Sequence, residues 1–292
     1  MRACGVAWYP CGFGSKVLQE KLDEFLKLRM IEGLGERWLY NVRAFITEYL
    51  KALDYNIDYK KTLEYLSGLQ KRISITSFRK RTYQIRKYLV YLKVDWANSI
   101  NPPSEPIYLP KRITTEEISK TIEFFKSDEY HLQCKSLILL GASCGARAEE
   151  LYQIGIEDLD LENRTIQINH DPSNGQTTKT KQSRISFFTP EAKEALEAYL
   201  AFFKQSNLDI LYSQSHITRL FRDAPIQVKD LRKYFSQTWD RNSGPTGIKK
   251  QLMGHSLKSD VDCQHYNGQS EEDLKKIYDK VMCEGGAVVV RN

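Results

Sequence analysis

The chain of 292 residues lacks any run of about eighteen apolar residues, so no transmembrane helix is expected. Its first residues, MRACGVAWYPCGFG, lack the long apolar region and the cleavage site of a signal peptide. Internal repeats and low-complexity segments are also absent. A hydrophobic content of 41% and a charged content of 27% are typical of a globular protein with room for two domains. Together these features predict a soluble protein of the cytoplasm.

Cysteine is scarce, and its pattern excludes two classes of protein. The six cysteines form no CxxC pair and no tight Cys/His cluster, so a structural zinc site is not expected. A disulfide framework is not expected in a chain of this length either. Cys134 and Cys144 lie in apolar sequence with helical character, which predicts small residues of a core.

The net charge of +6 is unevenly distributed along the chain. Residues 1–105 contain 18 Lys and Arg against 11 Asp and Glu, a net charge of +7. The remaining residues contain 25 basic and 26 acidic side chains, a net charge of −1. A positive excess confined to the first third favours a DNA-binding domain there. The alternative is a basic surface that only faces solvent.

Residues 1–97 have the periodicity of a small helical bundle. The first helix is expected to begin at Ser15 as its N-cap. Its apolar stripe comprises Val17, Leu18, Leu22, Phe25 and Leu26. Three more helices are expected, over residues 36–53, 59–70 and 75–94.

Residues 71–87, KRISITSFRKRTYQIRK, contain seven basic residues and no acid. The basic residues are Lys71, Arg72, Arg79, Lys80, Arg81, Arg86 and Lys87. A helix of this kind can lie in the major groove of DNA, with cations on phosphates and one or two side chains on base edges. In the alternative interpretation, Phe78, Tyr83 and Tyr88 fill the core of the bundle and the cations face water. The two interpretations are compatible.

Residues 98–111 contain four prolines among polar residues, which predicts a linker rather than a helix. A second domain is expected over residues 112–292. Its first helix is expected to begin near Thr114 or Thr115, because glutamates follow these residues as in a capping box.

The second domain is predicted to be mainly helical with a small antiparallel sheet. Residues 163–171 and 183–189 alternate as strands, and the polar, glycine-containing segment 171–182 is expected to join them as a hairpin loop. Helices are expected at about residues 114–127, 130–143, 190–205, 214–222, 227–241, 246–253 and 271–282, with another beginning near Ala146.

Five short motifs in this domain carry residues suited to phosphoryl transfer. They are GARAEEL with Arg147 and Glu150, TKTKQSR with Lys179, KDLRKYF with Lys229 and Arg232, LMGHS with His255, and QHYNG with Tyr266. Moving a DNA phosphoryl group without a metal requires a nucleophile, positive charge on the non-bridging oxygens and an acid for the leaving oxygen. Arginine suits the second role because its planar fork donates two hydrogen bonds and stays protonated.

In this order, the motifs resemble those of the tyrosine recombinases, also called phage-type integrases. The resemblance implies that Arg147 binds the scissile phosphate with support from Glu150. It implies that Lys179 is the general acid for the leaving 5′ oxygen, with Lys181 as the second choice. Taken alone, each of these residues has an ordinary structural or solvent-facing interpretation. Five motifs in the family's order favour the functional one.

Two positions depart from the usual family pattern. Lys229 stands where the family usually has histidine, although Arg232 keeps the place of the second phosphate-binding arginine. A lysine at this position is similar to the integrases of archaeal viruses and plasmids. His255 is expected to donate a hydrogen bond to the phosphate. Tyr266, the implied nucleophile, follows His255 by eleven residues instead of the usual nine.

Other residues near the C-terminal end compete for these roles. His265 is a second candidate for a phosphate contact. Tyr234 and Tyr278 are alternative nucleophiles, but both lie in helical sequence and are expected to pack in the core. Tyr266 instead has polar loop sequence on both sides.

The resemblance implies a site-specific recombinase of a mobile genetic element, which cuts and rejoins DNA through a 3′-phosphotyrosyl intermediate. The implied partners are double-stranded DNA and further copies of the chain, with four protomers holding two sites, and no membrane. No metal or other cofactor is required. The protein is expected in the cytoplasm on DNA, in a host cell if it is viral. Two alternatives stay open: a type IB topoisomerase-like nicking and closing enzyme, and a degenerate recombinase that only binds DNA.

Overall fold

The computed structural model describes residues 14–203, 210–255 and 268–285. The chain divides into two compact units, Met1–Leu109 and Pro110–Asn292. The division falls in the proline-rich stretch, where Ile107 and Leu109 are almost fully exposed. Within the described ranges, no helix is both long and apolar enough to cross a membrane.

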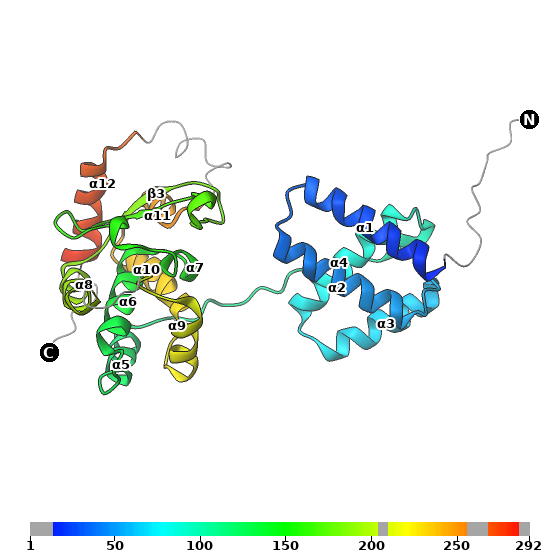
Figure 1. Ribbon diagram of the computed structural model, residues 1–292, viewed down its shortest axis with the longest axis horizontal. Helices are drawn as coiled ribbons and strands as arrows, with labels where there is room; N and C mark the ends of the chain where they lie inside the picture. The colour runs from blue at the N-terminus through cyan, green and yellow to red at the C-terminus, as the bar shows by residue number, and fades with distance from the viewer. Residues whose placement is uncertain (1–13, 204–209, 256–267, 286–292) are drawn as a thin grey trace, which may run out of the picture. The chain divides into compact units, whose positions relative to one another are not determined.

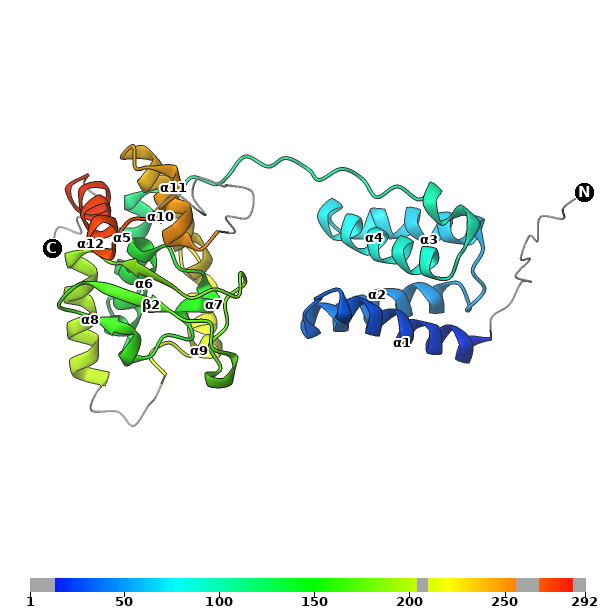
Figure 2. The same ribbon diagram turned by 90° about the horizontal axis from the view of Figure 1, so that it is seen from above.

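The described residues of the first unit form a bundle of four α-helices followed by one short 3-10 helix (Figure 1). The elements are α1 (Ser15–Ile31), α2 (Glu36–Ala52), α3 (Tyr59–Arg72), α4 (Ile75–Tyr91) and η1 (Asp95–Ser99). Figure 2 shows α1 and α2 as one pair and α3 and α4 as another, and α4 also contacts α1 and α2. A shared apolar core therefore holds the bundle together.

Two buried tyrosines join the helices of this bundle through their hydroxyl groups. Tyr88 donates a hydrogen bond of 2.9 Å to the carbonyl oxygen of Leu18, which ties α4 to α1. The hydroxyls of Tyr49 and Thr62 lie 2.8 Å apart and tie α2 to α3. A buried phenol needs such a partner, because an unpaired polar group in a core costs free energy.

The start of α1 differs from the sequence expectation. Gly14 is the N-cap and Ser15 is the first helical residue, so the predicted capping role of Ser15 is wrong. The predicted stripe is buried except for Val17, which is 40% exposed. Val17 precedes the buried Leu18 by one position, and the turn of 100° per residue carries its side chain to the edge of the packed face.

The second unit combines further helices with a small sheet. Its α-helices are α5 (Thr115–Phe124), α6 (His131–Cys144), α7 (Ala148–Leu151), α8 (Pro190–Phe203), α9 (Gln214–Leu220), α10 (Val228–Arg241), α11 (Thr246–Met253) and α12 (Glu271–Tyr278). Its other helical segments are η2 (Ile156–Asp158), η3 (Pro172–Asn174), η4 (Phe221–Asp223) and the π-helical η6 (Asp279–Glu284). Its strands are β1 (Leu159–Asp160), β2 (Thr165–Ile168) and β3 (Arg184–Phe187). The predicted fold class is therefore confirmed.

The helix α6 is the centre of the second unit. Every residue from Ser136 to Cys144 is buried, as expected for a helix that is apolar on all sides. It packs against α8 and α10, which flank it in Figures 1 and 2. Cys134 and Cys144 lie in this core as predicted, and burial raises the pKa of their thiols to about 12 and about 11. Thr114 caps α5 in a reciprocal pair with Glu117, which confirms the predicted start of this helix.

The sheet is antiparallel with the order β1-β2-β3. The predicted hairpin corresponds to β2 and β3, with Ile168 opposite Arg184 and Ile166 opposite Ser186. Strand β1 was not predicted, because its two residues are too few for an alternating pattern.

A second apolar cluster joins β3 to α10, α11 and α12. Tyr278 of α12 is fully buried in it and donates a hydrogen bond of 2.9 Å to the carbonyl oxygen of Ser143 on α6. This contact holds α12 against α6.

The end of α6 is set by Gly145, which adopts the left-handed conformation with φ of 66°. A Cβ atom here would lie 2.5 Å from Cδ1 of Phe235 on α10, so the position requires glycine for two reasons. The turn that follows ends at Arg147, which is the N-cap of α7. The helix expected from Ala146 is thus only the four residues of α7.

We expect Gly145→Ala to lower the free energy of unfolding by about 2–4 kcal/mol, since left-handed strain and overpacking each cost about 1–2 kcal/mol or more. Urea unfolding measures the change. Gly175→Ala is the matched control, because Gly175 has φ of 73° but no atom within 4 Å of its Cβ position. It should cost only the strain, about 1–2 kcal/mol. Equal losses for the two variants would contradict the packing argument.

Candidate active site

The carboxylate of Glu150 lies at the centre of a buried group of charges. It accepts hydrogen bonds from Nη1 of Arg147 at 2.8 Å and from Nη2 and Nη1 of Arg184 at 2.7 and 3.2 Å. It also accepts the backbone N–H of Arg147 at 2.8 Å, which closes the first turn of α7. The Glu150 and Arg184 side chains are only 2% and 8% exposed. Strand β3 and helix α7 are therefore joined through this carboxylate.

The pairing decides the protonation state of Glu150. Burial by itself raises the pKa of this carboxyl, but the hydrogen bonds and charge of Arg184, together with the hydrogen bonds from Arg147, outweigh it. The resulting pKa is about 2, against an ordinary value of 4.5. Glu150 is therefore ionised at neutral pH and holds both guanidinium groups in place.

Arg147 also reaches the end of α11. Its Nη2 donates a hydrogen bond of 3.0 Å to the carbonyl oxygen of Gly254. Gly254 ends α11 in the left-handed conformation with φ of 63°, and a Cβ atom there would lie 2.7 Å from Nη1 of Arg184. His255 comes next, with its N–H bonded to the carbonyl oxygen of Lys250 at 2.9 Å. The backbone that carries His255 is thus held directly beside Arg147.

Arg232 approaches the same group from α10. Its Nη1 donates a hydrogen bond of 2.7 Å to the carbonyl oxygen of Gly145, two residues before Arg147. Burial and then the positive charge of Arg147 lower the pKa of Arg232 to about 10, with a smaller contribution from Arg184. The guanidinium stays charged at neutral pH, but its proton is held less tightly than usual because the group is partly buried and lies beside other positive charges.

His255 experiences the same positive charge. Partial burial, followed by the charges of Arg232 and Arg147, lowers its pKa below the ordinary 6.5, although the residue keeps access to solvent. The imidazole is consequently neutral at pH 7, with one ring N–H available as a donor.

The structure thus brings together Arg147, Glu150, Arg232 and His255, which belong to motifs spread over more than one hundred residues. Arg184 completes the group, and sequence analysis assigned it no role. The sequence does contain one indication of its importance: Arg184 is a charged residue in the strand sequence SRISFFT. An arginine on a buried face of a strand requires a partner for its charge. Three guanidinium groups around one carboxylate leave an excess of positive charge, which favours binding of an anion such as a phosphate.

The two candidate lysines lie at the surface. Lys179 is exposed in the turn between β2 and β3, as is Lys181, whose φ is 56°. Lys229 is exposed in the first turn of α10, three residues before Arg232, so both share one side of the helix. In the part of the chain that the structure describes, neither Lys179 nor Lys229 has an ion-pair partner for its ammonium group.

The candidate nucleophile Tyr266 lies outside the described residues, as does His265. Both competing tyrosines are fully buried, as predicted. The hydroxyl of Tyr234 lies 3.1 Å from that of Thr115. Burial raises the pKa of Tyr278 well above 10, which makes it a poor nucleophile.

The basic residues expected to contact DNA lie at the end of α3 and on several sides of α4. Arg81 pairs with Glu48 of α2 at 2.8 Å and lies 4.7 Å from the ring centre of Phe45. Nε of Arg79 donates to the carbonyl oxygen of Pro103 at 3.1 Å. Exposed members of the set are Lys71, Arg72 and Lys80. Part of the basic segment therefore holds the fold of this unit together.

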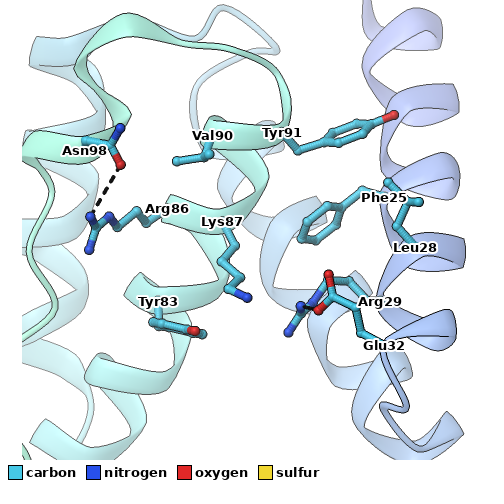
Figure 3. A pocket seen from close by; sticks show the side chains of 10 residues that line it. All are labelled: Phe25, Leu28, Arg29, Glu32, Tyr83, Arg86, Lys87, Val90, Tyr91 and Asn98. Carbon is cyan, nitrogen blue, oxygen red and sulfur yellow. Dashed lines mark hydrogen bonds and ion pairs between the residues drawn. The ribbon is translucent and has the colours of Figure 1, made fainter.

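Two further basic residues of the segment line a groove of about 430 Å³ between α1 and α4 (Figure 3). Nη2 of Arg86 donates to Oδ1 of Asn98 at 3.4 Å, and Nζ of Lys87 lies 5.4 Å from the ring centre of Tyr83. Phe78 and Tyr88 are buried in the core, but Tyr83 is 44% exposed. Phe78 and Tyr88 therefore agree with the interpretation in which the aromatic residues fill the core, and Tyr83 does not.

The sequence was compared with known proteins. Residues 111–274 match the phage integrase family. Tyrosine recombinase XerA of Pyrococcus horikoshii is 24% identical over 265 residues, which cover 89% of this chain and 88% of that protein. Tyrosine recombinase XerA of Saccharolobus solfataricus is 28% identical over 227 residues, covering 74% and 73%. A solved lambda integrase dimer bound to a COC′ core site has a TM-score of 0.63 at 14% identity, covering 86% of this chain and 96% of that chain.

The matched segment spans more than half of the chain, so the protein belongs to the phage integrase family. The resemblance to tyrosine recombinases is thereby confirmed. The archaeal sources of both XerA relatives fit the expected archaeal subgroup.

We expect Glu150→Gln to lower the free energy of unfolding by about 3 kcal/mol at pH 7, because two buried guanidinium groups lose their counter-charge. Stabilisation by the ionised carboxylate is complete above the ordinary pKa of 4.5 and is lost as the pH falls towards the folded-state value of about 2. The difference between the wild type and the variant should therefore shrink in that window.

Urea unfolding at several pH values measures this difference. Glu149→Gln, a change at the exposed neighbouring residue, is the control and should shift stability by less than about 0.5 kcal/mol. A glutamine variant at position 150 as stable as the wild type at pH 7 would show that the carboxylate does not hold the cluster together.

Proposed function

We propose that this member of the phage integrase family is a site-specific DNA recombinase whose phosphate-binding site is built from Arg147, Arg232, Lys229 and His255. The observation that carries the assignment is the meeting of Arg147, Arg232 and the backbone of His255 beside one buried carboxylate. The excess positive charge of this group suits a phosphodiester, and it suits the more negative transition state better still.

In the proposed reaction, the phenolate oxygen of Tyr266 attacks the phosphorus of the scissile phosphate. The guanidinium groups of Arg147 and Arg232 donate to its non-bridging oxygens, and neutral His255 donates one ring N–H. The bond between phosphorus and the 5′ oxygen breaks, and Lys179 gives a proton to that oxygen as it leaves. A 3′-phosphotyrosyl link remains, and a 5′ hydroxyl from another strand reverses the step.

Lys229 contributes a positive donor in place of the usual histidine. Its position one helical turn before Arg232 allows both side chains to approach the same phosphate from α10. Lysine carries three N–H donors on a flexible stem, so it can bind a phosphate oxygen without the fixed plane of an imidazole.

We propose residues 1–97 as a core DNA-binding domain, 98–111 as a linker and 112–292 as the catalytic domain with its C-terminal tail.

The partners follow from the proposed chemistry. Duplex DNA is the substrate, and four protomers exchange strands between two sites. The solved lambda integrase is a dimer bound to a core site, which supports the binding of more than one copy to DNA. The protein acts on DNA in the cytoplasm.

Tyr266→Phe should abolish the covalent adduct while DNA affinity changes little, because phenylalanine removes only the attacking oxygen. Nicked duplexes of random sequence trap the adduct, since the short 5′-hydroxyl fragment diffuses away after cleavage. Denaturing gels measure the adduct, and mass spectrometry locates the DNA-linked residue. Cleavage by trypsin after Lys258 and Lys275 gives a peptide in which Tyr266 is the one tyrosine.

Tyr108→Phe, at an exposed tyrosine of the linker, is the matched control and should retain the adduct. An adduct that persists in Tyr266→Phe would place the nucleophile elsewhere. No adduct from the wild type would favour a protein that only binds DNA. Relaxation of supercoiled plasmid without strand exchange would favour the topoisomerase-like alternative.

Arg147→Ala and Arg232→Ala should each lower the rate of adduct formation by about 100-fold or more, since a lost transition-state donor costs about 3 kcal/mol. DNA affinity should fall by less than about tenfold, because one of many phosphate contacts is removed. Single-turnover cleavage and equilibrium binding measure the two effects separately.

Arg222→Ala removes an exposed arginine of the same unit and should leave both quantities unchanged. Losses of equal size in cleavage and binding would argue against a transition-state role for Arg147 and Arg232.

A further inference from the structure

The loop that carries Lys179 has a defined internal structure. We call residues 169–183, between β2 and β3, the lysine hairpin. Thr178 is 6% exposed, and its hydroxyl bonds to the backbone N–H and carbonyl of Gln182 at 3.1 and 3.0 Å. Its N–H donates to Nδ1 of His170 at 3.1 Å. The backbone under Lys179 is therefore held in a tight turn, although the lysine side chain itself is exposed.

This turn is fastened to the end of α7 by the side chain of Gln153. The backbone N–H of Thr177 donates to Oε1 of Gln153 at 2.5 Å. Nε2 of Gln153 in turn donates to the carbonyl oxygen of Glu149 at 2.6 Å. One amide group thus links the hairpin to α7, which contains Glu150 and has Arg147 as its N-cap.

A second link uses the buried carboxylate of Asp158, which is 5% exposed. It accepts hydrogen bonds from Nε2 of Gln176 at 2.9 Å, Nδ2 of Asn169 at 2.8 Å and the N–H of Gly155 at 2.9 Å. Asn169 and Gln176 lie in the two arms of the hairpin. A small cavity of about 10 Å³ is lined by Glu150, Gln153 and Asp158, so these links are adjacent to the charge cluster.

We infer that Gln153 and Asp158 are positioning residues that hold the lysine hairpin in register with the phosphate-binding cluster. The inference rests on the proposed role of Lys179 as general acid. Proton transfer requires the ammonium nitrogen to lie within hydrogen-bond reach of the leaving oxygen, and a displacement of about 1 Å can cost about 100-fold in rate. Because Arg147 caps the start of α7 and Gln153, two residues past its end, bonds to the carbonyl oxygen of Glu149 within it, one short helix sets both positions.

The chemistry of the leaving group separates this role from a general effect on folding. With the natural substrate, the 5′ oxygen takes the electron pair of the broken bond and needs a proton from Lys179. When sulfur replaces that oxygen, the phosphorus–sulfur bond breaks and the thiolate leaves without a proton, since a thiol has a pKa of about 8.5. A defect in delivering the acid should therefore vanish with the sulfur substrate, but a defect in holding the phosphate should persist.

The test compares oxygen and sulfur at the cut position in a duplex that the wild-type protein selects from a random pool by covalent capture. Gln153→Ala and Asp158→Asn should cleave the oxygen substrate about 10- to 100-fold more slowly than the wild type. They should cleave the sulfur substrate within about threefold of the wild-type rate, as should Lys179→Ala. Arg147→Ala should be slow on both substrates.

Asn163→Ala is the matched control, because among the described residues the Asn163 side chain bonds only to Asp160, within the turn between β1 and β2. It should cleave both substrates at the wild-type rate. If sulfur rescues Lys179→Ala but neither Gln153→Ala nor Asp158→Asn, or if these two variants cleave the oxygen substrate normally, the positioning inference is wrong. If Lys179→Ala cleaves the oxygen substrate normally, the proposed general acid itself is wrong.

Discussion

The arrangement of the site depends on one buried carboxylate shared by two guanidinium groups. Glu150 binds Arg147 within its own helix turn and Arg184 on a strand that is more than thirty residues away in the sequence. Removing either arginine would leave a charged group in a region that solvent barely reaches, which is costly. The contact therefore places the start of α7 against β3 and fixes the orientation of the Arg147 guanidinium.

Positive charge is concentrated around this contact, and the fold offsets the repulsion with backbone dipoles. Arg147, Arg184 and Arg232 donate to the carbonyl oxygens of Gly254, Leu252 and Gly145, respectively. These partial charges satisfy the donors without cancelling the net charge. Burial first, and then the positive charge of the neighbouring arginines, lowers the pKa values of Arg232 and His255. A phosphate that enters the remaining positive potential is stabilised, and a developing negative charge more so.

Local sequence patterns encode most of the helices and the hairpin of this fold. Helical periodicity placed α3, α6 and α11 close to their observed bounds, and alternation found both strands of the hairpin. Motif order identified the family. The pattern failed where a property depends on contacts distant in sequence. Arg184 has the sequence context of a strand residue, and only its contact with Glu150 shows its importance.

The basic segment, residues 71–87, is a second case in which contacts distant in sequence decide the role of a residue. Its seven cations look uniform in the sequence, yet the fold directs Arg81 towards an acid on α2 and Arg79 towards the proline-rich stretch. Helical spacing alone could not separate them, because an acid or an acceptor on another element decides which cation stays available. The positions of Tyr266 and of its neighbours relative to the cluster remain a prediction from motif order.

The arginine contacts to carbonyl oxygens have a consequence for how this enzyme can diverge. A backbone carbonyl is the same hydrogen-bond acceptor whatever side chain its residue carries. Gly145 and Gly254 are exceptions, because their positive φ angles and close packing require glycine. Leu252 can therefore be exchanged for another apolar residue without moving the acceptor of Arg184. Drift in the surrounding side chains therefore leaves the arrangement of the three guanidinium groups intact as long as the path of the main chain is kept.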